Sequence, residues 1–256
     1  MEIRELIEKL EEKYPLDLQE QWDNSGLQIG NPGNDLKNVM ISLDLEEEGI
    51  DEAIKNNCNL IITHHPYIFN DIRYIDFTDQ FYKRLEKVIK NDISVYSMHT
   101  NLDKASDGLN DNLAEILNLK NIKILENEQN PGLGRYGDIY ERNTQNLAEN
   151  IKGKLNARGV ICYGNMDKKI KTLAVCGGAG AVLFDDCLKL GIDAIVTADV
   201  KYHEAMDYSD KGLLIIDPGH FASENHVIYK LKDVVSEMTD SKIYTYSKDD
   251  TFRTFI

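Results

Sequence analysis

Hydrophobic residues recur at helical or strand spacing along most of this chain of 256 residues. Near the start, an apolar stripe at i, i+3, i+4 and i+7 predicts an amphipathic helix that stops before Pro15; its members are Ile3, Leu6, Ile7 and Leu10. The same criteria predict helices at residues 46–57, 81–89, 109–117, 145–155, 182–190 and 227–238, and strands at residues 38–43, 60–63, 93–97, 159–163, 171–176, 194–197 and 213–216.

Strands that alternate with helices of about ten or more residues indicate α/β layers with largely parallel pairing. The polar stretch Glu126–Gly134, which contains Pro131 and two glycines, is the best candidate for a domain boundary. We therefore predict an α/β protein with two lobes, residues 1–127 and residues 128–256, built on mixed, largely parallel sheets. The candidate functional residues divide between them as His64, His65 and Asp103 in the first lobe and His203, His220 and Glu224 in the second.

Composition narrows the class of protein. The chain has 44 acidic and 29 basic side chains, a formal net charge of −15 and 42% hydrophobic residues, which is typical of a globular protein. This acidic balance disfavours nonspecific nucleic-acid binding, which needs a basic surface. No apolar run reaches the length of about 18 residues that would indicate a membrane span, and the N-terminal helix lacks the apolar centre of a signal peptide.

The cysteines indicate the redox environment. None of the four belongs to a Cys-x-x-Cys pair, and three sit inside apolar runs: Cys58, Cys162, Cys176 and Cys187. Buried free thiols in a reducing compartment are the plain interpretation, so we expect a cytoplasmic protein. Most of the acid is expected to solvate the surface, and the open question is whether some of it belongs to a cation site.

Histidines lie within a few residues of the ends of three of the predicted strands. In open α/β sheets ligands bind outside the carboxyl ends of the strands, so side chains at these ends are expected to converge. Two carboxylates accompany them, those of Asp103 and Glu224. Glu224 lies four residues after His220, so the two share one face if a helix begins near Phe221. The candidate ligands are therefore His64, His65, Asp103, His220 and Glu224, with His99 beside them.

The chemistry expected of this group is metal binding. Imidazole nitrogen and carboxylate oxygen suit zinc, iron, manganese or nickel better than calcium or magnesium. Three histidines and two carboxylates exceed the needs of one tetrahedral ion with an open position, and suit two ions about 3.5–4 Å apart with a bridging water as nucleophile. Each residue alone also has a structural interpretation: a hydrogen-bonded histidine, a helix cap at Asp103, or an exposed acid at Glu224.

Six segments, in order along nearly the whole chain, resemble the GTP cyclohydrolase 1 type 2 homolog family, also called the NIF-three-like dinuclear-metal proteins. These segments are Trp22–Gln28, Thr63–Pro66, His99–Asp103, Val175–Gly180, Thr197–His203 and Asp217–Glu224. The resemblance implies two α/β lobes with two metals in a cleft between them, and often a toroidal homohexamer. It implies that the metals are bound by the residues matching the family's ligands, which are His64, His65, Asp103, His220 and Glu224.

The resemblance also implies a short form of the family, because too few residues separate Asp103 from Cys176 for the inserted middle domain of longer relatives. One departure concerns the fifth segment. Ala198 stands where the family usually has glycine, which puts a close approach of the backbone there in doubt.

Other residues near these segments have two interpretations each. His203 is a candidate proton donor or substrate contact, or else a capping residue, and His99 is expected to orient Asp103 or another ligand. The turn at residues 177–180 could cradle a phosphate, although a tight strand-to-helix turn is favoured. Trp22, the one tryptophan, lines a cleft or belongs to the core, and His226 is expected on an exposed helix face.

Two functional hypotheses remain open at this stage. The first is a dinuclear metal-dependent hydrolase acting on a small molecule, with a nucleotide or phosphoester as the expected substrate class. The second is a metal-binding interaction or regulatory protein without catalytic turnover. An open coordination position facing solvent favours the enzyme, whereas saturated coordination in a closed pocket favours the second hypothesis.

Overall fold

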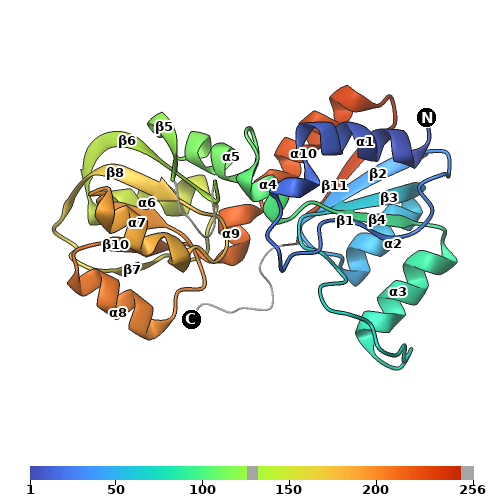
Figure 1. Ribbon diagram of the computed structural model, residues 1–256, viewed down its shortest axis with the longest axis horizontal. Helices are drawn as coiled ribbons and strands as arrows, with labels where there is room; N and C mark the ends of the chain where they lie inside the picture. Colours follow the sequence, from blue (N-terminus) through green and yellow to red (C-terminus); the bar gives the residue numbers. More distant parts are fainter. Residues whose placement is uncertain (126–131, 249–256) are drawn as a thin grey trace. The chain divides into compact units, whose positions relative to one another are not determined.

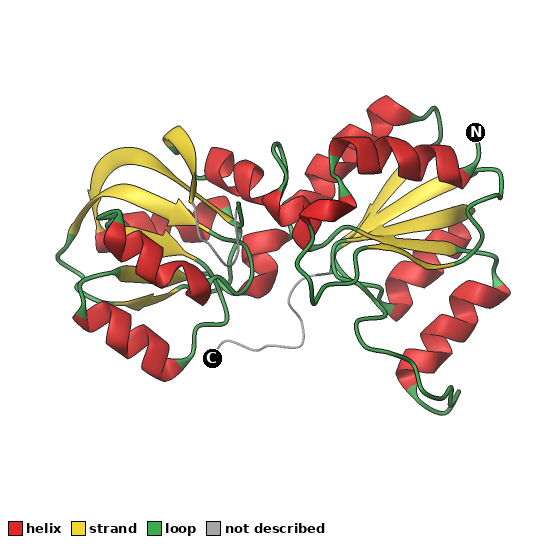
Figure 2. Cartoon of the chain, in the orientation of Figure 1, coloured by secondary structure: helices red, strands yellow, loops and turns green. Residues whose placement is uncertain are grey.

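The computed structural model describes residues 1–125 and 132–248 (Figure 1). These residues form two compact units, the first made of residues 1–102 and 227–248 and the second of residues 103–125 and 132–226. Each unit contains its own mixed sheet flanked by helices, as Figure 2 shows. The predicted α/β class with two lobes is therefore confirmed.

The course of the chain through the two units differs from the predicted one. The predicted boundary between residues 127 and 128 lies outside the described residues. On either side of it, β5 (Lys120–Leu125) and β6 (Gly134–Asn143) pair antiparallel in the second unit, so a boundary there would divide a sheet. The C-terminal segment returns instead to the first unit, where β11 (Ile243–Tyr246) pairs with β2 (Asn38–Ser42). Asp103 consequently belongs to the second unit rather than the first.

The described part of the first unit has a five-stranded sheet in the order β1-β4-β3-β2-β11, with β1 antiparallel to β4 and the other neighbours parallel. Figure 1 shows α1 and α10 over one face of this sheet and α2 and α3 over the other. Central strand β3 is buried along its whole length because both faces are covered. The elements are α1 Ile3–Lys13, a 3-10 turn Leu16–Leu18, β1 Gly26–Ile29, β2, α2 Glu47–Lys55, β3 Cys58–Thr63, α3 Gln80–Lys90, β4 Ser94–Ser97, α10 Val227–Met238 and β11.

The described part of the second unit has a six-stranded sheet in the order β5-β6-β8-β9-β10-β7. Strands β8, β9 and β10 are parallel, and the remaining neighbours are antiparallel. Its other elements are α5 Leu109–Ile116, α6 Thr144–Lys154, β7 Ile161–Tyr163, β8 Lys169–Val175, a 3-10 turn Ala181–Leu183, α7 Phe184–Lys189, β9 Ala194–Val196, α8 Tyr202–Asp210, β10 Leu214–Asp217 and α9 His220–Glu224, while the short α4 Thr100–Lys104 leads into this unit.

Side chains of the central strands alternate between two hydrophobic clusters in the second unit. Leu173 and Val175 of β8 pack with α5 and α6, whereas Ala174 and Cys176 pack with α7 on the other face. This alternation is the period of two that a strand imposes, and it explains why these strands read as continuous apolar runs. Both faces are filled, so polar chemistry is confined to the strand ends. Among the described residues, no helix is long and apolar enough to cross a membrane.

Candidate metal centre

In the first unit, two histidines leave the end of β3 side by side. The backbone N–H groups of His64 and His65 both donate to the carbonyl of Leu43, at 3.1 and 3.0 Å, which fixes the chain just before Pro66. His64 is fully buried and its Nδ1 lies 2.7 Å from the carbonyl oxygen of Met98. His65 is partly exposed, and its Nδ1 lies 2.8 Å from Asp44 Oδ1. The centroids of the two rings lie 4.9 Å apart, with 46° between the ring planes, so the two imidazoles are neighbours.

His99, at the end of β4, joins this pair. Its ring stands edge-on to both other rings, with centroids 5.4 Å from His64 and 5.6 Å from His65. One nitrogen from each of the three rings lies within 4.8 Å of the others, which is close enough for a shared cation. His99 is therefore a member of the histidine cluster, and its role is not limited to orienting another ligand.

Asp23 holds His99 in place. Its side chain is fully buried and its Oδ1 lies 2.7 Å from His99 Nδ1, while its Oδ2 accepts from the backbone and hydroxyl of Thr100 at 3.0 and 2.5 Å. Burial alone would raise the pKa of this carboxyl, but the hydrogen bonds from His99 and Thr100 outweigh it and hold the pKa well below its usual range. Asp23 is thus a permanently charged acceptor for the imidazole.

In the second unit, His220 and Glu224 begin and end α9. The four-residue spacing puts His220 Nε2 2.9 Å from Glu224 Oε2, as predicted, although the helix starts at His220 itself. His220 Nδ1 lies 2.6 Å from Asp199 Oδ2. Asp199 has a φ of +54°, in the left-handed region that aspartate adopts more readily than most residues.

Four histidines share one hydrogen-bonding pattern, in which Nδ1 faces a carbonyl or carboxylate oxygen. These oxygens only accept, so each Nδ1 is the donor of its hydrogen bond. Metal-ligating histidines in proteins adopt this arrangement, because the outer hydrogen bond fixes the tautomer and the ring orientation. In α9, Nε2 of His220 lies 2.9 Å from a carboxylate oxygen of Glu224, a contact that either a proton on Nε2 or a bound cation would stabilise. The four are His64, His65, His99 and His220.

The glycine turn between β8 and α7 packs against this pair. A Cβ on Gly178 would lie 2.3 Å from Glu224 Oε1 and 3.2 Å from His220 Cε1, so only glycine allows the carboxylate to sit there. The N–H groups of Gly177, Gly178 and Gly180 donate to side chains of Asn110, Ser223 and Thr197. They are therefore engaged within the protein, which supports the interpretation as a tight turn rather than a phosphate cradle.

Ala198, which stands where the family usually has glycine, fits its surroundings. It is fully buried and its N–H donates to the carbonyl of Gly178 at 2.7 Å, so the methyl group is accommodated where the strand β9 meets the glycine turn. The neighbouring residue with left-handed backbone is Asp199 instead.

Asp103 lies in α4 and is 6% exposed. Asn110 donates to its backbone carbonyl at 3.2 Å and accepts from Gly177, which links this segment to the glycine turn. Burial, and then the charges of Asp103 and Glu224, raise the pKa of the Cys176 thiol well above its usual value. Both predicted carboxylates therefore act on the same buried thiol.

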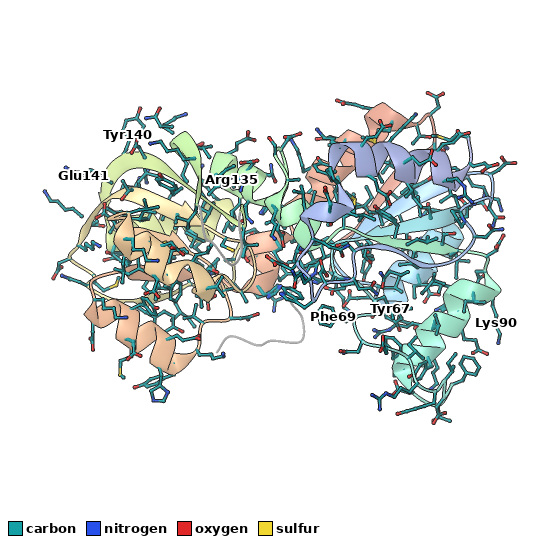
Figure 3. All side chains as sticks on the ribbon, viewed as in Figure 1. Tyr67, Phe69, Lys90, Arg135, Tyr140 and Glu141 are labelled. Atoms are coloured by element: carbon teal, nitrogen blue, oxygen red, sulfur yellow. The ribbon has the colours of Figure 1, made fainter. Side chains whose placement is uncertain are left out.

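Arg135, which Figure 3 labels, anchors the same segment. It is 2% exposed and forms a two-point contact with Asp111, with Nε–Oδ1 at 2.5 Å and Nη2–Oδ2 at 3.2 Å. Nη2 also donates to the carbonyls of Lys104 and Ala105, directly after Asp103, at 3.1 and 3.2 Å, and Nη1 donates to those of Gly132 and Gly134. The guanidinium thus fixes the backbone on which the Asp103 carboxylate is carried.

His203 lies in the first turn of α8 and is exposed, with its ring against that of Tyr202. Nearby Lys201 forms an exposed ion pair with Glu204 at 3.7 Å. In the second unit, Asp103, His220 and Glu224 lie around the glycine turn. The ring of His203 contacts Tyr202 instead.

His226 differs from the other histidines and from its prediction. Rather than lying on an exposed face, its ring is enclosed, with Nε2 2.9 Å from the Ser223 carbonyl and Nδ1 2.6 Å from the side chain of Asn112. Both ring nitrogens are engaged, so this histidine is a structural residue. Burial lowers its pKa to about 4, with the Ser223 hydrogen bond and the charge of Glu224 opposing that shift.

We expect this burial to make the protein acid-sensitive. The unfolded chain binds a proton at His226 near pH 6.5 and the folded chain at about 4, so the folded state loses stability as pH falls through that window. The full effect is about 3 kcal/mol. Urea denaturation at several pH values, comparing wild type with His226→Gln, measures it. The variant keeps a donor for the Ser223 carbonyl but cannot titrate; an identical pH dependence in both proteins would contradict the assignment.

Sequence reasoning missed the three carboxylates that orient the histidines: Asp23, Asp44 and Asp199. Two of them lie within three residues of the end of an apolar strand, Asp44 after β2 and Asp199 after β9. The rule of strand ends that selected the histidines would have found them if it had been applied to acids as well. Asp23 lies in the segment Trp22–Gln28 that carries the family resemblance, but nothing in the sequence links it to a histidine.

Comparisons with known proteins give the chain's relatives. Residues 1–250 match the family described as Duf34/NIF3 (NGG1p interacting factor 3). The "GTP cyclohydrolase 1 type 2 homolog" of Clostridium acetobutylicum is 36% identical over 229 residues, covering 88% of this chain and 85% of the relative. The protein of that name from Clostridium perfringens is 35% identical over 247 residues, covering 95% and 94%. The crystal structure of a Bacillus cereus protein related to NIF3 superposes with a TM-score of 0.93 at 26% identity, covering 100% of this chain and 99% of that one.

Proposed function

We propose, because the chain belongs to the Duf34/NIF3 family, that it is a metal-dependent hydrolase with two divalent ions per chain. The observation that carries the proposal is the hydrogen-bonding pattern shared by four histidines, in which each Nδ1 faces a carbonyl or carboxylate oxygen, as it does in metal-ligating histidines. The proposed ligands are those that the family resemblance implies: His64, His65, Asp103, His220 and Glu224.

The donor set fits zinc, iron, manganese or nickel, because it combines imidazole nitrogens with carboxylate oxygens. When bound, such ions lower the pKa of a coordinated water and polarise the group under attack. Asp44 and Asp199 orient His65 and His220 and increase the basicity of their Nε2 atoms. His99, with its Nδ1 proton held by Asp23, accepts a proton at Nε2, and His203 is the candidate donor to the leaving group.

The proposed substrate is a small molecule, a nucleotide or another phosphoester. Support comes from the name of the relatives, GTP cyclohydrolase 1 type 2 homolog, which points toward a nucleotide. The proposed setting is the cytoplasm, which four free cysteines support, and the proposed assembly is a homo-oligomer of six chains, carried over from the family resemblance.

A second candidate function is a metal-binding interaction or regulatory protein without turnover. It is favoured by the description of the family, which names an interacting factor. In that case the same ligands would hold ions in a saturated, structural coordination.

The proposed function is tested by screening nucleotides and phosphoesters against iron, manganese and zinc forms of the protein. We expect product formation by wild type, and a loss of about a hundredfold or more in His64→Ala/His65→Ala, because both ligands at the end of β3 are removed. The structural His226→Gln should retain activity. Equal turnover in the double variant would contradict the proposal, and two bound ions with no turnover on any substrate would favour the second candidate.

A further inference from the structure

An exposed pair of aromatic rings borders the histidine cluster of the first unit. Trp22 is 58% exposed and Phe69 is 47% exposed, and their ring centroids lie 5.9 Å apart. Trp22 also meets His99 edge-on at 6.0 Å, with an angle of 73° between the ring planes. The pair, called here the aromatic wall, is therefore continuous with the imidazoles of His64, His65 and His99.

The two loops that carry the aromatic wall are joined by polar side chains. Asn24 Nδ2 donates to the carbonyl of Ile68 at 2.6 Å, and the N–H of Ile68 donates to Gln28 Oε1 at 3.0 Å. Gln28 Nε2 in turn donates to the carbonyl of Asn24 at 2.6 Å. Both backbone groups of Ile68, the residue before Phe69, are thus fixed by the segment that carries Trp22. The wall is ordered in advance of any ligand, which lowers the entropic cost of binding.

The wall has no evident role in folding the first unit. The buried hydrophobic cluster of that unit contains neither ring, and Trp22 keeps more than half of its surface accessible. A large aromatic surface held rigid and exposed next to polar chemistry is a common property of ligand sites. Flat π-faces of this kind bind other flat rings, and they do so with little dependence on ring substituents.

We infer that the aromatic wall binds a planar heteroaromatic ring of the substrate. This inference rests on the proposed function and narrows it: of nucleotides and other phosphoesters, the substrate is one that carries a base or comparable ring. Trp22 and Phe69 are then residues that determine specificity, since they contact the ring and not the bond that is broken. The neighbouring histidines lie where the reacting part of such a molecule would extend from the wall.

The test uses the single tryptophan of the chain as its own reporter. Wild-type protein, prepared with its metal, is titrated with guanosine 5′-monophosphate and, in parallel, with ribose 5-phosphate, while Trp22 emission is recorded. We expect saturable quenching by the nucleotide and none by ribose 5-phosphate at the same concentrations. Equal responses to both probes, or an emission that neither changes, would overturn the inference, the latter because it would mean that another surface covers the wall.

Variants then separate the wall from the metal centre. Affinity for guanosine 5′-monophosphate, measured by calorimetric titration, should be about tenfold or more weaker in Trp22→Leu than in wild type. In Trp22→Phe it should stay within about threefold of wild type, because phenylalanine keeps a stacking face. Tyr140→Leu removes an aromatic side chain that is 84% exposed in the second unit and serves as the matched control, with no change expected. Thermal denaturation checks that each variant is folded.

Metal content is measured in the same samples, so that the two claims fail separately. Trp22→Leu should retain the metal content of wild type. Unchanged nucleotide affinity in Trp22→Leu would overturn the role of the wall and leave the proposed metal centre standing. Intact ring binding together with full metal content in His64→Ala/His65→Ala would instead contradict the proposed function and leave the wall as a binding site.

Discussion

A Gly178→Ala substitution is expected to weaken metal binding by about 10–100-fold, as the loss of a residue supporting a ligand does. The added Cβ would lie 2.3 Å from Glu224 Oε1 and 3.2 Å from His220 Cε1, so the carboxylate and the imidazole could not keep their positions. The backbone φ of +60° adds strain of about 1–2 kcal/mol for any L side chain. Metal titration followed by calorimetry measures the loss, and urea denaturation measures the strain.

Gly191 offers the matched control for this effect. It has a nearly identical φ of +66°, but a Cβ there would meet nothing within 4 Å. Gly191→Ala should therefore show the backbone strain without the loss of metal affinity. If both alanine variants bind metal equally well, the close packing of Gly178 against the ligand pair has no functional role.

Arg135→Met is expected to destabilise the protein by about 3–5 kcal/mol, because it removes one partner of a buried ion pair and leaves the other in place. Asp111 would lose its two-point contact, and the carbonyls of Lys104 and Ala105 would lose their donors. Because those carbonyls directly follow Asp103, metal affinity should fall along with stability. Urea denaturation and metal titration of the same preparation measure the two effects.

Lys171→Met controls for the removal of a cation in general. Lys171 pairs with Glu141 on the surface at 3.0 Å, with side chains 68% and 41% exposed. Exposed pairs of this kind contribute about 0–1 kcal/mol, so stability should be nearly unchanged. A loss in Lys171→Met as large as that in Arg135→Met would mean that burial of the arginine is not the cause.

The periodic elements of the fold could be predicted from the sequence, whereas the edge strands β5 and β11 could not. Helix α1 and strands β3 and β9 could be predicted because their apolar side chains are buried in a core, which leaves a regular apolar pattern in the sequence. Strand β5, by contrast, is exposed at five of its six positions, so burial leaves no pattern in its sequence. β11 reaches the first unit through a pairing with β2, about 200 residues earlier in the chain, which no local pattern encodes.

The candidate ligands could be selected from the sequence because histidine is rare in the chain and lies within a few residues of strand ends. The tautomers could not, since they depend on which oxygen faces each Nδ1 after folding. The contrast between His220 and His226 shows this well. His220 begins α9 and His226 lies in the turn just after that helix, but in His226 both ring nitrogens are engaged within the protein, and only the structure distinguishes a candidate ligand from a structural residue.

The most direct test of this account is the number of divalent ions bound per chain in protein purified without chelator. The account predicts about two ions in wild type and in His226→Gln, and a marked loss in His64→Ala/His65→Ala and in His220→Ala. Elemental analysis of the same folded preparations provides the measurement. Fewer than about one ion per wild-type chain, or two ions retained in the double variant, would contradict the account.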